Sequence, residues 1–408
     1  MKNKKVLFLT TANLSIKPRL VKEIKEAQKK YEVHLVSFTI GNWSDSNHRN
    51  LADQLNIKNI ELSATRNNFI QWLIVTSINK ISLLLWPLFK KNLLLTTCAS
   101  NKKSIILLLY ILFNREKYCF ANGRNNATLY PVYLLKTIKK TPFIFDVEDY
   151  HPCENVSWCN SLNEKMRREI LMRNILPNSA YITSASPGIE QKTLDLLKSK
   201  INHQIILNSF PMGEFLQPTM NAENHKLKFV WFSLEISKSR GLEILLPALY
   251  EFKGDIELTL IGDLNQQFYN DFLVEYKELI NFKPPMSQKK MHRKLIDFDI
   301  GLALELSDID LNKQLALSNK IYAYTQAGLY ILATDTLAQK QFIEEAPERG
   351  IVCGQTIVSM KKTLLQMIKN KEKIRANAVK RYNNAKSLAW ENERVKLSEI
   401  WANIKTNH

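Results

Sequence analysis

The feature that most constrains the fold is an alternation of short apolar runs, rich in Val, Ile and Phe, with amphipathic stretches along almost the whole chain. This alternation is typical of β-α-β units on a parallel sheet. Ten runs are predicted to be strands, in two series: 5–11, 31–38, 141–147, 180–186 and 204–210, then 226–233, 255–262, 298–305, 329–335 and 350–354. The sequence therefore predicts the α/β class with two similar, doubly wound halves.

A polar stretch without periodicity, "PMGEFLQPTMNAENHK", separates the two series and is a plausible linker. A chain of 408 residues is also longer than a single core usually supports. We therefore predict an N-terminal domain at 1–212, a C-terminal domain at 213–388 and an amphipathic terminal helix at 389–408. Open parallel sheets bind ligands beyond the carboxyl ends of their strands, so a cleft between two facing halves is the expected site.

The formal net charge of +18 calls for an acidic partner, which could be nucleic acid, anionic lipid or a phosphorylated substrate. No acidic residue occurs between Glu61 and Glu116, where basic residues alternate with apolar runs and tryptophans. Segment 67–113 therefore suits the headgroup region of an anionic membrane, although each run is too short to span one. The alternative is a set of core helices edged by solvated lysines. We find no nucleic-acid recognition module and expect no nucleic-acid partner.

The five cysteines are scattered and form no C-x-x-C pair, which favours a reducing compartment and no zinc site. The apolar run near the N-terminus is too short for a signal peptide and is expected to be the first strand. We therefore expect a cytoplasmic protein.

Two stretches of the second half are suited to binding an anion. Lys238 and Arg240 lie in a loop before a helix that Gly241 opens, and a cationic loop at a helix start can hold a diphosphate. The alternative is two solvated surface residues. The stretch "SNKIYAYTQAG" predicts a second helix from about residue 319, with Ser318 or Asn319 as its N-cap, ending near Gly328.

The first half has polar residues in two loops. Asn13, Lys17 and Arg19 precede its first predicted helix. Carboxylates and a histidine follow the predicted strand at 141–147: Asp146, Glu148, Asp149, His151 and Glu154. Asp149 and His151 could supply acid or base chemistry, whereas Asp146 is expected to be structural. Metal binding is the weaker alternative, because no ligand spacing is diagnostic.

Taken in order, these motifs resemble the family-4-like bacterial glycosyltransferases of the GT-B fold over nearly the whole chain. The resemblance lies in the Lys-Pro-Arg start of the first helix, in "FDVEDYHP", "ILNSFP", "SKSRGLEILLPAL", "DFDIGLAL" and "LSNKIYAYTQAGLYILATD", and in the terminal "AWENERVKLSEIW". It implies two Rossmann-like domains facing across a cleft, with a C-terminal helix that crosses back to the N-terminal domain.

The resemblance also implies roles for individual residues. The donor-binding residues would be Ser233, Lys238, Arg240, Glu305, Ser318, Asn319, Lys320 and Tyr322. The acceptor side would involve Asn13, Lys17 and Arg19, and the catalytic residues would be Glu148, Asp149 and His151.

The implied activity is metal-independent and hexosyltransferase-like, with no cofactor. A sugar would pass from a UDP- or GDP-sugar to a lipid-linked or other glycan acceptor in capsule, exopolysaccharide or lipopolysaccharide synthesis. The resemblance implies retention of anomeric configuration. With the basic apolar segment, it implies a peripheral protein on the anionic inner face of the cytoplasmic membrane.

The chain departs from the family pattern at several positions. The paired glutamates of the family fall on Leu315 and Ala323, so we expect Glu305, Asp308 or Asp310 to make the ribose contact instead. If the protein is an active enzyme, an Ala323→Glu change should be tolerated or should tighten nucleotide binding. The family's histidine aligns with Glu148, and its usual glycine after the first strand of the second half is Ser233.

These departures keep two alternatives open. One is a non-catalytic GT-B homologue that acts as a partner subunit or glycan-binding protein. The other is a different GT-B enzyme, such as a sugar epimerase or an inverting transferase, with Asp149 or His151 as its base.

Overall fold

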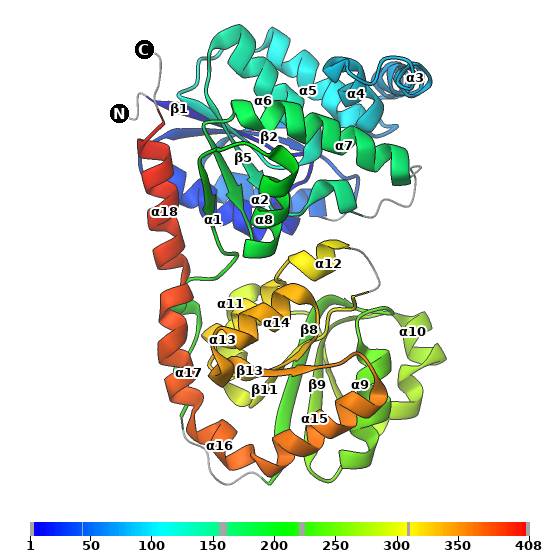
Figure 1. The fold of residues 1–408 in the computed structure, drawn as a ribbon, viewed down its shortest axis with the longest axis vertical. Helices are drawn as coiled ribbons and strands as arrows, with labels where there is room; N and C mark the ends of the chain where they lie inside the picture. The colour runs from blue at the N-terminus through cyan, green and yellow to red at the C-terminus, as the bar shows by residue number, and fades with distance from the viewer. Residues whose placement is uncertain (1–3, 43, 155–160, 220–224, 308–310, 405–408) are drawn as a thin grey trace. The chain divides into compact units, whose positions relative to one another are not determined.

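The computed structural model describes residues 4–42, 44–154, 161–219, 225–307 and 311–404. The chain forms two compact units: unit 1 comprises Met1–Ile206 and Arg394–His408, and unit 2 comprises Leu207–Glu393. Unit 2 thus begins at Leu207, whereas the sequence placed the boundary at 213. Within each unit, helices lie on both faces of one parallel sheet (Figure 1).

The sheet of unit 1 has seven strands in the described residues, in the order β3-β2-β1-β4-β5-β6-β7, and all of its pairings are parallel. Its strands are β1 (Lys5–Leu9), β2 (Glu32–Phe38), β3 (Lys58–Leu62), β4 (Phe120–Gly123), β5 (Phe143–Val147), β6 (Tyr181–Ser184) and β7 (His203–Ile205). Its helices are α1 (Pro18–Ala27), α2 (Ser44–Gln54), α3 (Phe69–Leu85), α4 (Leu93–Ser100), α5 (Lys102–Phe113), α6 (Asn126–Lys139), α7 (Ser161–Ile175) and α8 (Pro187–Leu197).

The sheet of unit 2 has six strands in the described residues, in the order β10-β9-β8-β11-β12-β13, again all parallel. Its strands are β8 (Leu227–Ile236), β9 (Ile256–Leu264), β10 (Ile280–Lys283), β11 (Ile300–Ala303), β12 (Tyr330–Thr334) and β13 (Gly350–Cys353). Its helices are α9 (Leu242–Leu249), α10 (Gln266–Asp271), α11 (Gln288–Lys294), α12 (Leu311–Leu315), α13 (Asn319–Gln326), α14 (Leu337–Glu344), α15 (Ile357–Lys369), α16 (Lys371–Ala376) and α17 (Ala378–Ala385).

Side chains alternate between the two faces of the sheet along each strand, and unit 2 therefore has two buried cores, one on each face. Phe229 and Trp231 of β8 pack with α9 and α15 on one face of the sheet, and Val230 packs with α11, α13 and α14 on the other. Successive strand residues point to opposite faces, so a parallel sheet covered on both sides requires apolar residues at nearly every position. This explains why "FVWF", residues 229–232, is continuously apolar.

Nine of the ten predicted strands are present, and the tenth, 204–210, overlaps β7 only at residues 204 and 205. The structure adds β3, β4 and β10. The predicted helix at residue 319 is α13, with Ser318 as its N-cap residue. The prediction of an α/β fold with two Rossmann-like, doubly wound domains is confirmed.

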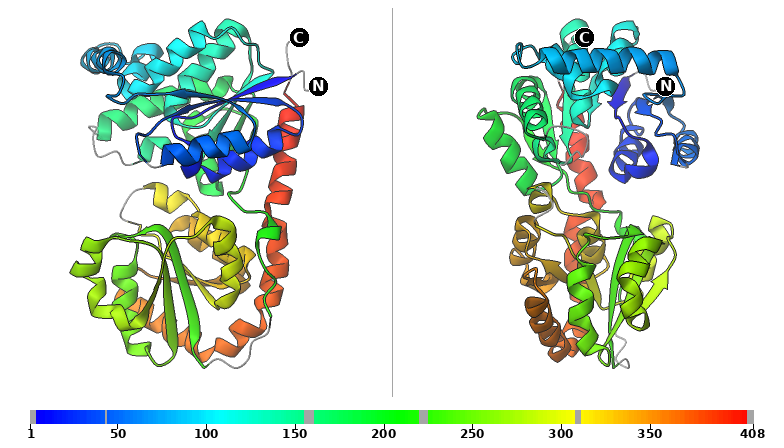
Figure 2. Two further views of the ribbon diagram at one scale, coloured as in Figure 1. Left: turned by 180° about the vertical axis from the view of Figure 1, so that it is seen from behind. Right: turned by 90° about the vertical axis from the view of Figure 1, so that its right-hand side faces the viewer.

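The terminal helix α18 (Trp390–Ala402) begins in unit 2 and ends in unit 1. Within unit 1, Trp401 stacks on Phe120 with ring centroids 6.1 Å apart, and Tyr31 packs edge-on against Trp401 at 6.5 Å. The end of the chain therefore completes the unit that the beginning of the chain builds (Figure 2).

Candidate functional site

The polar groups of unit 2 gather where β11 ends and α13 begins. Two residues after Ala303, the last residue of β11, the backbone N–H of Glu305 donates to Thr334 Oγ1 at 2.9 Å. Helix α13 lies so close to β11 that a Cβ on Gly301 would be 2.2 Å from the Tyr324 ring. A glycine on the strand therefore allows the helix start to approach the strand's carboxyl end.

An ion cluster occupies this position. Glu305 Oε2 lies 2.9 Å from Lys313 Nζ, and Glu305 Oε1 lies 3.3 Å from Lys320 Nζ. Burial opposes ionisation of Glu305, but Lys320 and Lys313 outweigh burial and lower its pKa to about 2. Burial lowers the pKa of Lys320, and the cations Lys313 and Arg240 add to that shift against the opposing Glu305. More positive than negative charge is therefore held here, which suits an anionic ligand.

The start of α13 adds hydrogen-bonding groups. The Ser318 hydroxyl is buried and has no hydrogen-bond partner among the described residues, while Asn319 Oδ1 accepts from Asn208 Nδ2 at 2.6 Å. Lys320 Nζ lies 5.7 Å from the centroid of the Trp231 ring. The first turn of a helix also presents free backbone N–H groups and a positive dipole end.

The loop after β8 brings Arg240 to the same place. Strand β8 runs to Ile236 and changes register between Phe232 and Glu235, so it continues beyond the predicted end at 233. Gly241 has φ +80°, and a Cβ there would be 2.8 Å from Leu304 Cβ. The loop therefore packs directly against the residue before Glu305. We call Arg240, Glu305, Lys313, Ser318 and Lys320 the cationic corner.

Three predicted donor residues have other surroundings. Lys238 is exposed and pairs with Asp271 at 3.1 Å. Tyr322 is fully buried in a core position, with its ring edge-on to Phe342 at 6.0 Å, and its role in donor binding stays a prediction. Ser233 lies in the irregular part of β8, and its carbonyl oxygen would be 2.6 Å from a Cβ on Gly262. Asp308 and Asp310 lie outside the described residues.

Unit 1 contains a second polar cluster, at the end of β5. Arg19 donates to both carboxylate oxygens of Asp146, at 3.0 Å from Nε and 2.7 Å from Nη2, and also to the Ile206 carbonyl. Arg124 Nη1 lies 2.7 Å from Glu23 Oε2, and Arg124 Nη2 also reaches Asp146. Asp146 is therefore structural, as predicted.

Asn13 and Arg19 are also interior residues. Asn13 is fully buried and donates to Ser44 Oγ at 2.7 Å, and Arg19 is 1% exposed. Burial leaves neither side chain on the protein surface, and their roles on the acceptor side stay predictions. Lys17 is partly exposed, but its Nζ pairs with Glu148 Oε2 at 2.7 Å.

The predicted catalytic residues have different electrostatic surroundings. Burial alone would raise the pKa of Glu148, but Arg124, Lys17 and Arg19 hold it well below its usual range, which makes the Glu148 carboxylate a weak base. Burial raises the pKa of Asp149, and His151 and Lys17 offset only part of that shift. Asp149 is thus the better candidate for proton transfer.

His151 begins a single 3-10 turn, His151–Cys153, and is 4% exposed. Its Nδ1 lies 3.3 Å from Glu154 Oε2, and its Nε2 is buried without a partner among the described residues. Its carbonyl accepts from Arg168 Nη1 at 2.7 Å, which fixes the turn. Nε2 is therefore a buried polar atom whose hydrogen-bonding capacity is unused among the described residues.

Helix α3 carries an exposed apolar stripe. Its members recur at helical spacing and continue into the following turn: Ile70, Ile74, Ile81, Leu84 and Leu88 are 72%, 52%, 55%, 78% and 77% exposed. Val75 and Trp86, on the other side, are each 1% exposed and face the protein. We call these five exposed residues the apolar stripe.

Among the described residues, no helix is long and apolar enough to cross a membrane. In the same part of the chain, no group of three or more His, Cys, Asp or Glu side chains could hold a metal ion.

No model of a known protein family matches the sequence, and no curated protein matches it in a sequence search. Solved structures do match. The Anabaena protein Alr3699/HepE in complex with UDP is similar with a TM-score of 0.68 and 12% identity, covering 98% of this chain and 99% of that one. A glycosyltransferase from Rickettsia africae has a TM-score of 0.66 and 14% identity over 100% of both chains.

A third match is the sucrose-phosphate synthase of Thermosynechococcus elongatus, with a TM-score of 0.67 and 12% identity over 98% of each chain. These likenesses show the fold. Both units together have the GT-B architecture, as the sequence predicted.

Proposed function

We propose that this protein is a glycosyltransferase that takes a sugar from a nucleotide-sugar donor bound at the cationic corner. The observation that carries the proposal is the arrangement of Arg240, Lys313, Lys320 and the start of α13 around a single carboxylate at the carboxyl ends of the strands. Ligands of open parallel sheets bind at that edge. The complex of Anabaena HepE with UDP-glucose, a structure of similar fold, supports a nucleotide-sugar as the ligand class.

The departing nucleoside diphosphate is where negative charge grows in the transition state. Arg240 and Lys320 would hold its phosphates with the N–H groups of α13, and fixed positive groups stabilise that charge without reorganisation. Glu305 keeps the two lysines in place before the donor arrives. Asp149 or His151 would accept the proton of the acceptor hydroxyl.

The finer assignments rest on the family resemblance. We propose a hexosyl group transferred without a metal ion, with retention of configuration, onto a precursor of a capsule, exopolysaccharide or lipopolysaccharide.

Donor binding can be tested by calorimetry with UDP, GDP and their hexose conjugates. The Lys320→Gln variant removes a charge-assisted hydrogen bond to phosphate, and we expect it to weaken binding roughly 10-fold or more. The control is Lys340→Gln, since Lys340 is an exposed lysine of α14 that pairs with Glu344. Equal affinity of the two variants, or no binding of any nucleotide by the folded protein, would contradict the proposal.

A non-catalytic GT-B homologue is the second candidate, and one observation favours it. Both lysines of the corner already have an anionic partner in Glu305, and the positions of the family's glutamates, Leu315 and Ala323, are buried and apolar. Such a protein would bind a partner subunit or a glycan. It predicts that an Arg240→Ala variant keeps full function in cells, whereas the enzyme reading predicts a severe loss.

We also propose that the acceptor is carried on a lipid and that the apolar stripe of α3 docks on the anionic inner face of the cytoplasmic membrane. Ile70, Leu84 and Leu88 are 72%, 78% and 77% exposed in a region without acidic residues. An amphipathic surface with basic neighbours binds the interface of anionic bilayers through both apolar burial and charge.

Flotation with phosphatidylglycerol-containing vesicles and with pure phosphatidylcholine vesicles tests the docking. We expect the wild type to float with the anionic vesicles and the Ile74→Glu/Leu84→Glu variant to remain in solution. Val358→Glu is the control, because Val358 is 79% exposed in α15 of unit 2. If the double variant floated like the wild type, the stripe would have no part in membrane binding.

A further inference from the structure

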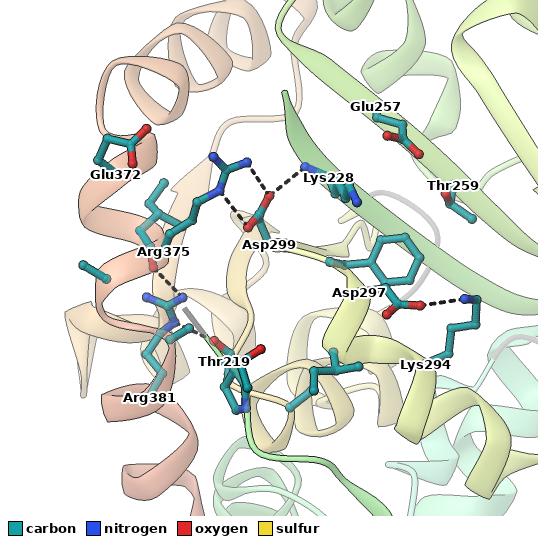
Figure 3. A pocket seen from close by; sticks show the side chains of 18 of the residues that line it. Thr219, Lys228, Glu257, Thr259, Lys294, Asp297, Asp299, Glu372, Arg375 and Arg381 are labelled. Carbon is teal, nitrogen blue, oxygen red and sulfur yellow. Dashed lines mark hydrogen bonds and ion pairs between the residues drawn. The ribbon is translucent and has the colours of Figure 1, made fainter. Parts of the chain in front are cut away.

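Unit 2 contains a cavity of about 640 Å³ at the edge where its strands begin. Lys228, Glu257 and Asn281, which line the cavity, are the second residues of β8, β9 and β10, and residues of α16 and α17 line it as well (Figure 3). Glu305, by contrast, lies two residues beyond Ala303, the last residue of β11. Because all strands of this sheet are parallel, the cavity and the cationic corner lie at opposite edges of it.

The sheet presents a polar row to this cavity. Lys228 pairs with Glu257 in the strand register, and Thr259 pairs with Asn281, so these four side chains share one face of the sheet. It is the face on which Val230 and Ile261 are covered by α11 and α13. Where that apolar cover ends, the strands carry hydrogen-bonding and charged groups.

Arg381 of α17 is a cation of this cavity that lacks an acidic partner. It is 5% exposed, its Nε donates to the Gly328 carbonyl at 2.9 Å, and its Nη2 donates to the Ile374 carbonyl at 2.8 Å. No carboxylate lies within 4.0 Å of it in the described residues. Burial lowers its pKa to about 10. Buried charges are normally paired, so a buried arginine without a counter-ion is suited to an external anion.

The charge of Asp299 partly offsets the effect of burial on the pKa of Arg381, but the Asp299 carboxylate is hydrogen-bonded by other groups. Asp299 is engaged by Arg375, at 3.1 Å from both Nε and Nη2, and by the backbone N–H of Lys228 at 2.9 Å. Asp297 pairs with Lys294 at 2.6 Å. The side chains of Lys228, Lys283 and Arg381 form no ion pair among the described residues. Neither do those of Glu257 and Glu372, so the unpaired cations of the cavity lining outnumber the unpaired anions by one.

We propose that this cavity binds a small polar molecule through an anionic group, a phosphate or a carboxylate, held by Arg381 and Lys228. The cavity volume is in the range of small-molecule sites. Glu257 and Glu372, which also line it, favour a ligand whose remaining part carries hydrogen-bond donors over a polyanion. The proposal concerns a second site and does not rest on the proposed enzymatic activity.

A ligand here would act on α13. Arg381 holds the carbonyl of Gly328, two residues after the end of α13, and the first turn of the same helix belongs to the cationic corner. A cation at a helix's C-terminal end stabilises the helix through its dipole. Drawing Arg381 toward an anion would therefore change how firmly α13 is held at its far end.

Thermal unfolding with added inorganic phosphate or citrate, compared with chloride at equal ionic strength, tests the site. A ligand that binds the native state raises Tm with its concentration. We expect this rise in the wild type and at least about a 5-fold weaker affinity in the Lys228→Gln/Lys283→Gln variant, because a charge-assisted hydrogen bond is lost. Lys294→Gln is the control, since that lysine also lines the cavity but is already paired with Asp297.

The Lys320→Gln variant separates this site from the cationic corner. A response that persists in Lys320→Gln and falls in the double variant supports the proposal, and the relative effects of phosphate and citrate then identify the anionic group. A response that vanishes in Lys320→Gln, or that is equal in the double variant and the wild type, overturns it. So does the absence of any response to either anion.

Discussion

Four charged side chains share the interior of unit 1: Arg19, Glu23, Arg124 and Asp146 are each exposed by 1% or less. Two guanidinium groups and two carboxylates balance there, and Glu148 at their edge is balanced by Lys17. Desolvation makes such a set costly, and it is tolerated only when every charge is paired. Removing one member therefore costs more than any single pair contributes.

Arg124→Met should lower the free energy of unfolding by about 3–5 kcal/mol, because Glu23 and Asp146 lose a buried partner. Urea denaturation measures this loss. The control is Arg49→Met. Because Arg49 is exposed and its pair with Glu61 is solvated, this change should lower the free energy of unfolding by only about 0.2–1 kcal/mol. Similar losses of unfolding free energy in the two variants would mean that the buried ion pairs stabilise the protein no more than an exposed pair does.

Ala323→Glu should destabilise the protein, contrary to the expectation from sequence that it is tolerated. Ala323 is fully buried in an apolar cluster, so a carboxylate there would be unpaired and overpacked, at a cost of more than about 3 kcal/mol. Thermal unfolding measures this loss of stability. The control variant is Ala402→Glu, because Ala402 is an exposed residue of α18. An unchanged Tm would show that the carboxylate finds a partner.

Glu305 gives the stability a pH dependence. Its pKa of about 2 in the folded state is below its ordinary 4.5, so the unfolded chain binds the proton more tightly. Its contribution is present above about pH 4.5 and is lost as the pH falls toward 2. The difference in unfolding free energy between wild type and Glu305→Gln should therefore shrink between pH 5 and pH 2. A difference that stays constant between pH 5 and pH 2 would mean that ionisation of Glu305 does not contribute to stability.

At the scale of elements, the placement of α13 depends on a strand glycine. We expect Gly301→Ala to push α13 away from β11, to cost at least about 1–3 kcal/mol and to weaken binding of the donor nucleotide. Gly254→Ala is the matched control, because nothing lies within 4 Å of the Cβ it would add. Denaturation and calorimetry measure both effects. Equal behaviour of the two variants would show that the helix adjusts freely.

The elements that the sequence missed share a physical cause. Strands β3 and β10 are at sheet edges, where most of their side chains are partly or fully exposed and no continuous apolar run is needed. Strand β4 is central, but it is four residues long and contains Asn122 and Gly123. Periodicity reports burial, so short or half-exposed strands escape it.

The candidate site could be predicted only in part, because burial is not visible in the order of residues. Residue type and order along the chain were enough to select Arg240, Glu305 and Lys320, which the fold brings together. Lys313 was missed because nothing in "LNKQ" marks its approach to Glu305. The burial of Tyr322 and Arg19 was not predicted, because sequence order does not show how deeply a side chain is buried.

At the scale of the whole molecule, the chain returns to its first unit through α18. Trp401→Ala should remove about 3–5 kcal/mol from unit 1, because its ring packs on Phe120 and is 4% exposed. Hydrogen exchange should then show faster opening of unit 1 and unchanged protection of unit 2. Val395→Ala, at a half-exposed position of the same helix, serves as the control. Equal changes in both units would mean that they unfold as one.

The interior charges of unit 1 also restrict how this sequence can diverge. Because Arg19, Glu23, Arg124 and Asp146 neutralise one another, a substitution at any one of them is harmful until the others change with it. An apolar set of similar volume could replace them all at little cost, but every intermediate would carry an unpaired charge. Distant relatives should therefore keep all four residues or none, as a group that is inherited together.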